Sequence, residues 1–270
     1  MPAGVICLLG DAHLDVVVTI SGPIAADTDT AARTRVTPGG QAANVAAWVA
    51  ALGGRSRLIA ARAADAAGTL VTSDLSGRGV DVVGPVLAGN TGVVVSLSDG
   101  GSQRSMLTDR GVGPLLNAAA IDAGWLDGCT WLHLPAYSLT SEPIRGAALA
   151  AAEAARRVAA RLSVDLSSTA AIADYGASAL ATLLAGLGPD LVFGTRAETN
   201  LIGAVEGATM ITKLGADGVV VGGTPYQAVR TEPADATGAG DAFAAGYLVA
   251  GVHLGLAAAA RAVATIGAMP

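Results

Sequence analysis

The second half of the chain alternates short apolar segments with longer alanine-rich segments. Residues 130–134, 190–194 and 208–215 have the length and apolar content of buried strands, whereas residues 144–162 are long enough to form a helix. Strands that alternate with helices in this way favour a mostly parallel sheet with right-handed crossovers. The sequence therefore predicts an α/β fold built on one central sheet.

The first half of the chain contains two β-rich segments that lack helical periodicity. Residues 5–20 predict two short strands, and residues 91–110 predict a hairpin whose Asp-Gly-Gly turn lies at 99–101. We expect the segments near 13–37 and 91–110 to form a small sheet that projects from the main body as a lid. Neither an internal repeat nor a flexible linker is evident, so residues 1–270 are expected to form a single domain.

Residues 38–54 predict a helix that starts directly after two glycines. Its apolar stripe consists of Val45, Trp48, Val49 and Leu52. Gly39 and Gly40 allow a ligand to approach the backbone closely, and Asn44 would place an amide at the top of the stripe. Asn44 has a second interpretation, as a residue that caps the helix N-terminus.

A second glycine-containing helix start lies at residues 235–243, with the sequence DATGAGDAF. Small residues before a helix let several backbone N–H groups point at one spot, where the helix dipole favours an anion such as a phosphate in transfer. Asp241 lies beside this spot and can accept a proton from an attacking hydroxyl. The dipole predicts that Asp241 stays ionised at neutral pH. In the alternative interpretation, Asp241 only compensates the helix dipole.

Composition limits the partners and the compartment. Hydrophobic residues make up 52% of the 270 residues, and the net charge of −6 does not attract nucleic acid or anionic lipid over a broad face. The most apolar stretch, residues 242–260, is mostly alanine and glycine, so we interpret it as a buried helix pair and not as a membrane span. The absence of a basic leader and the separation of Cys7 and Cys129 predict a cytoplasmic protein with reduced thiols.

The two helix starts resemble both signatures of the PfkB family of carbohydrate kinases, the ribokinase-like kinases. TPGGQAANVAAWVAALG is similar to the Gly-Gly-x-x-x-Asn signature, and DATGAGDAF is similar to Asp-x-x-Gly-Ala-Gly-Asp-x-Phe. Weaker similarities, among them GDAHLD, LHLPAYSL and KLGADG, follow in order along the whole chain. The resemblance implies a three-layer fold with a small β-sheet lid. It also implies an ATP-dependent kinase that phosphorylates a hydroxyl of a ribose- or fructose-like sugar.

The resemblance implies a role for each matching residue. Asp241 would be the catalytic base, and the anion hole before it would consist of Gly238, Ala239 and Gly240. The implied substrate contacts are Asp15, Gly39, Gly40, Asn44 and His133. The implied nucleotide contacts are Thr195, Lys213, Gly215, Gly218 and Gly240. Glu198 would support Mg²⁺ through water, and the residues implied to bind a monovalent cation such as K⁺ are Asp235 and Thr237.

Several alternatives stay open at this stage. Thr195 stands where the family usually has Asn, and a weakened ATP–Mg²⁺ site would suit a non-catalytic sugar- or nucleotide-binding regulator. A nucleoside kinase is a further alternative, although aromatic residues, at 3%, offer little for a base to stack on. His133 and Asp165, each near a strand end, also have purely structural interpretations. The exposed edges of the lid predict a homodimer, because a partner would cover them.

Overall fold

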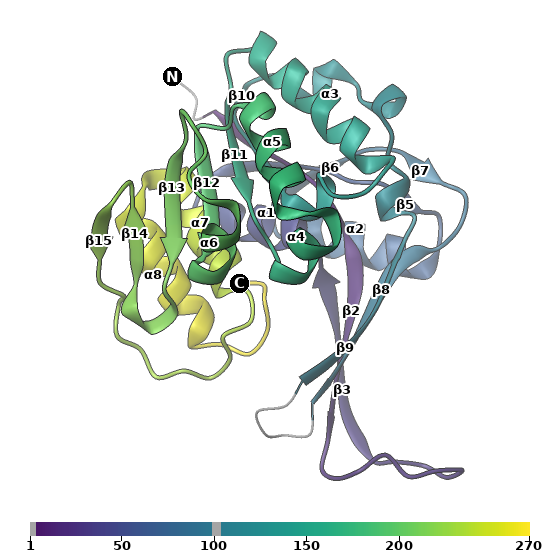
Figure 1. Ribbon diagram of the computed structural model, residues 1–270. Coiled ribbons are helices and arrows are strands. Elements are labelled where there is room, and N and C mark those ends of the chain that lie inside the picture. The colour runs from purple at the N-terminus through teal and green to yellow at the C-terminus, as the bar shows by residue number, and fades with distance from the viewer. Residues whose placement is uncertain (1–3, 99–103) are drawn as a thin grey trace.

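The computed structural model describes residues 4–98 and 104–270 as a layered main body with a small projecting sheet (Figure 1). The strands of the main sheet are β1 Val5–Leu9, β4 Arg55–Ile59, β6 Val80–Val83, β10 Cys129–Pro135, β11 Arg161–Asp165, β12 Leu191–Thr195, β13 Thr209–Lys213, β14 Val219–Val221 and β15 Thr224–Tyr226. Their order across the sheet is β15-β14-β13-β12-β11-β10-β1-β4-β6. The helices are α1 Gln41–Ala51, α2 Ala66–Gly77, α3 Ile144–Arg157, α4 Thr169–Tyr175, α5 Ala177–Leu187, α6 Arg196–Ile202, α7 Ala239–Ala250 and α8 Val252–Val263.

Both faces of the main sheet are buried, which explains why its strands are continuously apolar. In β1, Val5, Cys7 and Leu9 face the helices α3 to α6, whereas Ile6 and Leu8 face α1, α2, α7 and α8. Burying one such leucine contributes about 1.5–3 kcal/mol. The predicted α/β fold with helices on both faces of a mostly parallel sheet is thus confirmed.

One local expectation differs from the structure. The helix predicted over residues 144–162 ends at Arg157, because Arg161 to Asp165 pair with β10 and extended backbone cannot also be helical. The strands β13, β14 and β15 pair antiparallel, so the parallel order stops at this edge of the sheet. Antiparallel strands at the edge of a parallel sheet are common in α/β proteins.

The apolar segment near residues 242–260 forms two helices, α7 and α8, that pack against each other and break at Gly251, where φ is 85°. Within the described parts of the chain, no single helix is long and apolar enough to cross a membrane. The pair α4 and α5 reaches that length only together, and it is bent by 93°.

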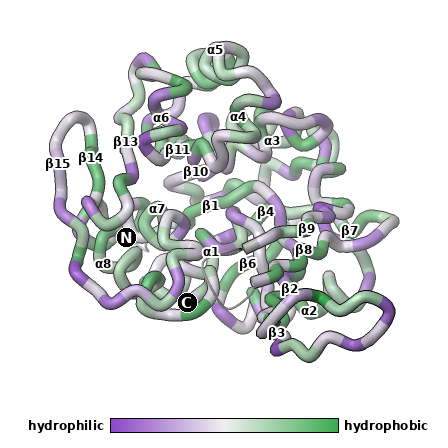
Figure 2. The backbone as a smooth tube through the Cα atoms, turned by 60° about the horizontal axis from the view of Figure 1, so that its bottom comes forward, coloured by the Kyte–Doolittle hydropathy of each residue, from purple (hydrophilic) through white to green (hydrophobic). Residues whose placement is uncertain are grey.

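The projecting sheet comprises β2 His13–Ile20, β3 Ala32–Gly39, β8 Thr91–Ser98 and β9 Arg104–Gly111, in the order β3-β2-β8-β9. Its two outer pairs are antiparallel and its central pair is parallel. The predicted turn at 99–101 lies outside the described residues. Figure 2 shows α2 beside this sheet. Because β2 follows β1 closely and β3 leads straight into α1, the sheet is rooted where β1 ends and α1 begins.

Candidate active site

Two helices begin next to each other at one end of the main sheet. Gly40 precedes α1 with φ at 101°, and a side chain there would place its Cβ 2.3 Å from the carbonyl oxygen of Asp11, so only glycine fits this turn. In the first turn of α1, Asn44 Nδ2 donates a hydrogen bond of 2.8 Å to Asp241 Oδ2 in the first turn of α7. Asn44 does not cap its helix, so that alternative is wrong, and the two signature segments meet through these side chains.

Burial dominates the protonation of Asp241. Loss of hydration, aided by the negative charge of Asp165, raises the pKa of its carboxyl group to about 7, although the hydrogen bond from Asn44 and the charge of Lys213 oppose the shift. The expectation that the helix dipole keeps Asp241 fully ionised at neutral pH is therefore wrong. A carboxylate whose pKa lies near neutrality is better matched to proton transfer than one with an ordinary pKa.

The turn before α7 has the shape expected of an anion hole. Gly238 is left-handed, with φ at 76°, and a side chain there would lie 2.5 Å from Ala268 Cα, so a glycine is required. Ala239 and Gly240 then form the first residues of the helix, where backbone N–H groups have no partner within the helix. A Cβ on Gly240 would lie 3.3 Å from Lys213 Nζ, which places the ammonium group beside this turn.

Lys213 is held by a residue that sequence reasoning treated as structural. Its Nζ lies 2.7 Å from Asp165 Oδ2, and the Asp165 side chain is only 1% exposed. Asp165 ends β11 and Lys213 ends β13, with β12 between them. A general signal was available in the sequence, because charged residues at the carboxyl ends of nearby parallel strands meet at one edge of a sheet.

The projecting sheet, which is the predicted lid, carries several polar residues at its root, where it joins the main body. A Cβ on Gly39 would lie 2.3 Å from Asp15 Cγ, so the absence of a side chain at 39 makes room for this carboxylate. His13 Nε2 is 3.0 Å from Asp15 Oδ1. Arg110 Nε on β9 donates to Asp11 Oδ2 at 2.7 Å, so Arg110 joins the lid to the main body.

Within the described residues, four buried polar atoms near this root have no hydrogen-bond partner. They are Asp11 Oδ1, His13 Nδ1, Gln41 Oε1 and Asn44 Oδ1. Burying a polar atom without a partner costs about 1–3 kcal/mol. Four such atoms in one region could pair with hydroxyl groups, so this region is the candidate sugar side of the site.

The predicted nucleotide residues lie around the ends of β12 and β13. Thr195 caps α6 by accepting a hydrogen bond from Glu198 N, and Glu198 Oε2 accepts one of 2.7 Å from Thr195 N. Gly215 and Gly218 have φ values of 61° and 93° in the turn after β13, so this turn requires them whether or not a nucleotide binds there.

The donor set fits a magnesium ion carried by nucleotide phosphates. No cluster of three or more His, Cys, Asp or Glu that could hold a metal occurs in residues 4–98 and 104–270. Mg²⁺ commonly keeps several waters and takes only one or two carboxylates besides the phosphates of its substrate. Glu198, buried at 6% exposure with one carboxylate oxygen engaged by Thr195 N, is suited to such an indirect contact.

Asp235 and Thr237, the residues predicted to bind a monovalent cation, order the loop before the predicted anion hole. Asp235 Oδ1 accepts hydrogen bonds from Thr237 N and Thr237 Oγ1 at 2.9 and 2.6 Å, and Asp235 Oδ2 accepts one from Gly267 N at 3.0 Å. The Asp235 carboxylate thus ties this loop to the segment that holds Ala268 against Gly238.

His133 lies in the core and not on a surface that a substrate could reach. It is fully buried, its Nδ1 is 2.9 Å from Ser163 Oγ, and its ring packs edge-on against Phe193. Burial lowers the pKa of His133 to about 4, so the ring is neutral at physiological pH. This environment favours the structural interpretation of His133.

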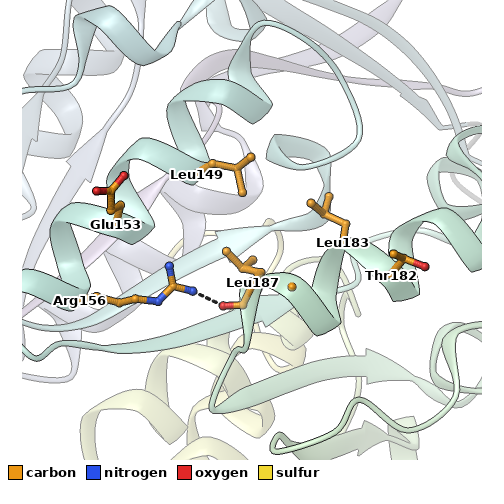
Figure 3. Close-up of a pocket in the computed structure, with 7 residues that line it drawn as sticks. Leu149, Glu153, Arg156, Thr182, Leu183 and Leu187 are labelled. Carbon is orange, nitrogen blue, oxygen red and sulfur yellow. Dashed lines mark hydrogen bonds between the residues drawn. The ribbon is translucent and has the colours of Figure 1, made fainter.

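A groove of about 330 Å³ lies elsewhere, between α3 and α5 (Figure 3). Leu149, Leu183 and Leu187 line it together with Glu153, Arg156, Thr182 and Gly186. Arg156 donates a hydrogen bond to the carbonyl oxygen of Leu187 across it. None of the predicted site residues borders this groove, so the candidate site rests on the polar groups around Asp241.

Sequence relatives of this chain are sugar kinases. The sequence model of the pfkB family of carbohydrate kinases matches residues 5–269. The chain is 30% identical over 248 residues to the ATP-dependent ribose-1-phosphate kinase of Halopiger xanaduensis, covering 88% of this chain and 82% of that protein. It is 29% identical over 266 residues to the fructokinase of Salmonella typhimurium, covering 89% and 82%.

Solved structures share the fold. The adenosine kinase of Sinorhizobium meliloti superposes with a TM-score of 0.86 at 23% identity, over 99% of this chain and 96% of that one. A protein of Escherichia coli provisionally called ribokinase II, solved in complex with ATP and Mg²⁺, has a TM-score of 0.85 at 21% identity, over 99% and 94%. At this identity the structural likeness concerns the fold alone.

Proposed function

The chain belongs to the pfkB family of carbohydrate kinases, and we propose that it transfers the γ-phosphoryl group of ATP to a hydroxyl of a free ribose- or fructose-like sugar. The observation that carries this proposal is the hydrogen bond of 2.8 Å between Asn44 and Asp241. It joins the segment of α1 that we propose contacts the sugar to the first turn of α7, where we propose the base and the anion hole. The two substrates would therefore meet at Asp241.

Different residues of the chain perform different steps of the proposed reaction. Asp241 accepts the proton of the attacking hydroxyl as the bond to phosphorus forms. The backbone N–H groups at 238–240 and the ammonium group of Lys213 stabilise the charge on the transferred group. Bound Mg²⁺ would neutralise phosphate charge, with Glu198 supporting it through water. The lid, rooted at Asp15 and Gly39, would exclude water as a competing acceptor.

The acceptor is proposed to be an uncharged polyol. Asp11 and Asp15 give the sugar side negative charge, and Asp11 already engages the guanidinium of Arg110. A phosphate on the sugar would meet these carboxylates, so a phosphosugar fits less well. A nucleoside is the second candidate, because the contacts suited to a sugar would also bind its ribose, and the adenosine kinase relative shares the fold.

A panel of acceptors tests the proposal. Purified protein is incubated with ATP, Mg²⁺ and, in turn, ribose, fructose, adenosine or ribose-1-phosphate, and ADP release is followed. We expect release that depends on a free sugar. Release only with adenosine would identify a nucleoside kinase, and release only with ribose-1-phosphate would contradict the uncharged acceptor. No release with any acceptor, alongside a rise in melting temperature with sugar or ATP, would identify a binding regulator.

Thr195→Asn should leave the KM for ATP unchanged or lower it. Asparagine caps a helix about as well as threonine, so α6 keeps its start, while the added amide can reach a phosphate or its water. Thr195→Ala is the matched control, because it removes the cap and should cost about 1 kcal/mol of stability. A KM for ATP that rises severalfold in Thr195→Asn would show that the site is built around threonine.

Potassium is expected to raise turnover by ordering the loop at Asp235 and Thr237. The carboxylate of Asp235 already organises this loop through Thr237 N and Gly267 N, and K⁺ bound at Asp235 and Thr237 would hold the loop in this arrangement. Rates are compared in potassium and in tetramethylammonium at equal ionic strength. Equal rates in the two salts would show that potassium does not raise turnover.

We propose that the chain forms a homodimer through the lid and acts in the cytoplasm, where ATP is available. Val36 on β3 and Met106 and Leu107 on β9 are 48–56% exposed, so the outer strands of the lid present apolar side chains. The expected result in light scattering is a dimer that Val36→Glu with Met106→Glu converts to a monomer. A wild-type monomer at the concentration used in the activity assay would rule this out.

A further inference from the structure

We propose that Asp165 is a positioning residue that aims Lys213 at the transferring phosphoryl group, which makes Lys213 the fixed cation of the anion hole. This inference rests on the proposed kinase function and assigns a role to a carboxylate whose hydrogen bonds go to Lys213 and Ser167. Lys213 is the single lysine of the chain. No other lysine can take this role.

The position of the ammonium group supports this assignment. Lys213 ends β13, and its Nζ lies 3.3 Å from where a Cβ on Gly240 would be, directly beside the turn that begins α7. Its side chain keeps 16% exposure, so it reaches the site while most of its stem is buried. An ammonium group has three donors, and Asp165 accepts from one of them at 2.7 Å. The remaining donors are available to phosphate oxygens.

The carboxylate of Asp165 is itself fixed in place. Oδ2 accepts from Lys213, and Oδ1 accepts a hydrogen bond of 3.0 Å from Ser167 N. Ser167 adopts φ of 65°, a conformation that costs a non-glycine residue about 1–3 kcal/mol. Ala136 N donates to Ser167 Oγ at 3.0 Å and stabilises that conformation. The chain thus tolerates backbone strain where it orients Asp165.

A purely structural role explains the pair less well. A buried ion pair is commonly no more stable than an apolar pair of similar volume. Burial disfavours the charge of Lys213, but neighbouring carboxylates, Asp165 foremost, outweigh it and raise the pKa of its ammonium group. A permanent cation is what a phosphoryl group with developing negative charge requires.

The groups that surround Asp241 and Lys213 come from every neighbouring element. They are Gln41 and Asn44 on α1, His133 on β10, Asp165 on β11, Glu198 on α6 and Lys213 on β13. Of these, Asp165 raises and Lys213 lowers the pKa of Asp241. Removing the charge of Asp165 should therefore lower the pKa of Asp241, and removing the charge of Lys213 should raise it.

Asp165→Asn, Lys213→Met and the double variant test the inference. We expect each single variant to raise the calorimetric Kd for ATP by about tenfold, the value of one charge-assisted hydrogen bond, and to lower kcat by at least as much. The double variant should resemble Lys213→Met, because Asp165 acts through Lys213. The acid limb of kcat should move to lower pH in Asp165→Asn and to higher pH in Lys213→Met.

Asp81→Asn is the matched control. It breaks an ion pair of 2.6 Å with Arg57 between β4 and β6, at the opposite edge of the main sheet, and should leave ATP affinity and the pH profile unchanged. If Asp165→Asn does not fold, Lys213→Arg decides instead, because it keeps the charge and should retain more ATP affinity than Lys213→Met.

Two results would overturn the inference. One is an Asp165→Asn protein that keeps its ATP affinity, kcat and acid limb and loses only melting temperature, as a structural ion pair would. The other is a double variant in which the two effects add. Failure of the kinase proposal is distinguishable, because wild-type protein would then phosphorylate no acceptor, while the comparison of ATP affinities would still decide the role of Asp165.

Discussion

Replacing Asp241 with asparagine should lower kcat by about 10²–10⁴-fold, the usual worth of a positioned general base. A neutral sugar hydroxyl is a poor nucleophile, and its proton must leave as the bond to phosphorus forms. Asparagine keeps the size of the side chain and can still accept a hydrogen bond from Asn44 Nδ2 through its carbonyl oxygen. Binding of ATP and of the sugar should therefore change little.

Single-turnover rate and melting temperature, measured on the same purified variant, separate the two roles of Asp241. A residue that only compensates the helix dipole would cost about 0.3–1 kcal/mol of stability and leave turnover near normal. A folded Asp241→Asn protein that keeps more than about a tenth of normal turnover would end the general-base assignment.

The wild-type pH profile follows from the same carboxyl group. Burial raises the pKa of Asp241 to about 7, and only the deprotonated form can accept the proton. Activity should therefore rise with pH to a plateau above neutrality and fall about tenfold per pH unit well below it. This acid limb should be missing from the residual activity of Asp241→Asn.

Gly39→Ala should lower kcat/KM for the sugar by about 10–10²-fold, the value of a charged hydrogen bond to a substrate hydroxyl. Its new Cβ would lie 2.3 Å from Asp15 Cγ, so the carboxylate must move away from its place at the root of the lid. Affinity for ATP should stay unchanged, because the residues predicted to contact the nucleotide lie on β12, β13, the turn after β13 and α7. Initial rates at varied sugar concentration and calorimetric titration with ATP measure both effects.

Two controls isolate the cause. Gly186→Ala lies within α5, where an added Cβ meets nothing within 4 Å, and it should leave activity unchanged. In an Asp15→Ala background, Gly39→Ala should have little further effect, because no carboxylate remains to be displaced. A full effect in that background would show that the backbone at Gly39 contacts the sugar directly.

Local sequence signals predicted several elements of this fold. The continuous apolar run of β1 indicated burial on two faces, and the glycines before α1 and α7 marked helix starts with unusual backbone conformations. These features depend on residues close in sequence or on simple periodicity, so the sequence alone is enough to predict them. Helix ends were harder to predict. The helix α3 ends at Arg157 because Arg161 already belongs to β11, and the pairing of β11 with the distant strand β10 fixes that boundary.

The chemistry of the site depends on contacts between distant residues. Burial, aided by the charge of Asp165 on β11, raises the pKa of Asp241 against the hydrogen bond from Asn44 on α1 and the charge of Lys213 on β13, whereas the sequence pointed only to the helix dipole. Asp165 meets Lys213 across the intervening strand β12, and the sequence indicates only that charged strand ends share this edge, not which two of them pair. His133 falls in a segment similar to the family, yet its side chain points into the core.

The central claim is that the terminal phosphoryl group of ATP passes to a sugar hydroxyl and not to water. Phosphorus NMR of a reaction with ATP, Mg²⁺ and the best acceptor of the panel tests it directly. We expect a phosphomonoester resonance that grows in step with ADP and is lost in Asp241→Asn. ADP accompanied by inorganic phosphate alone, at a rate that does not depend on the acceptor, would contradict the account.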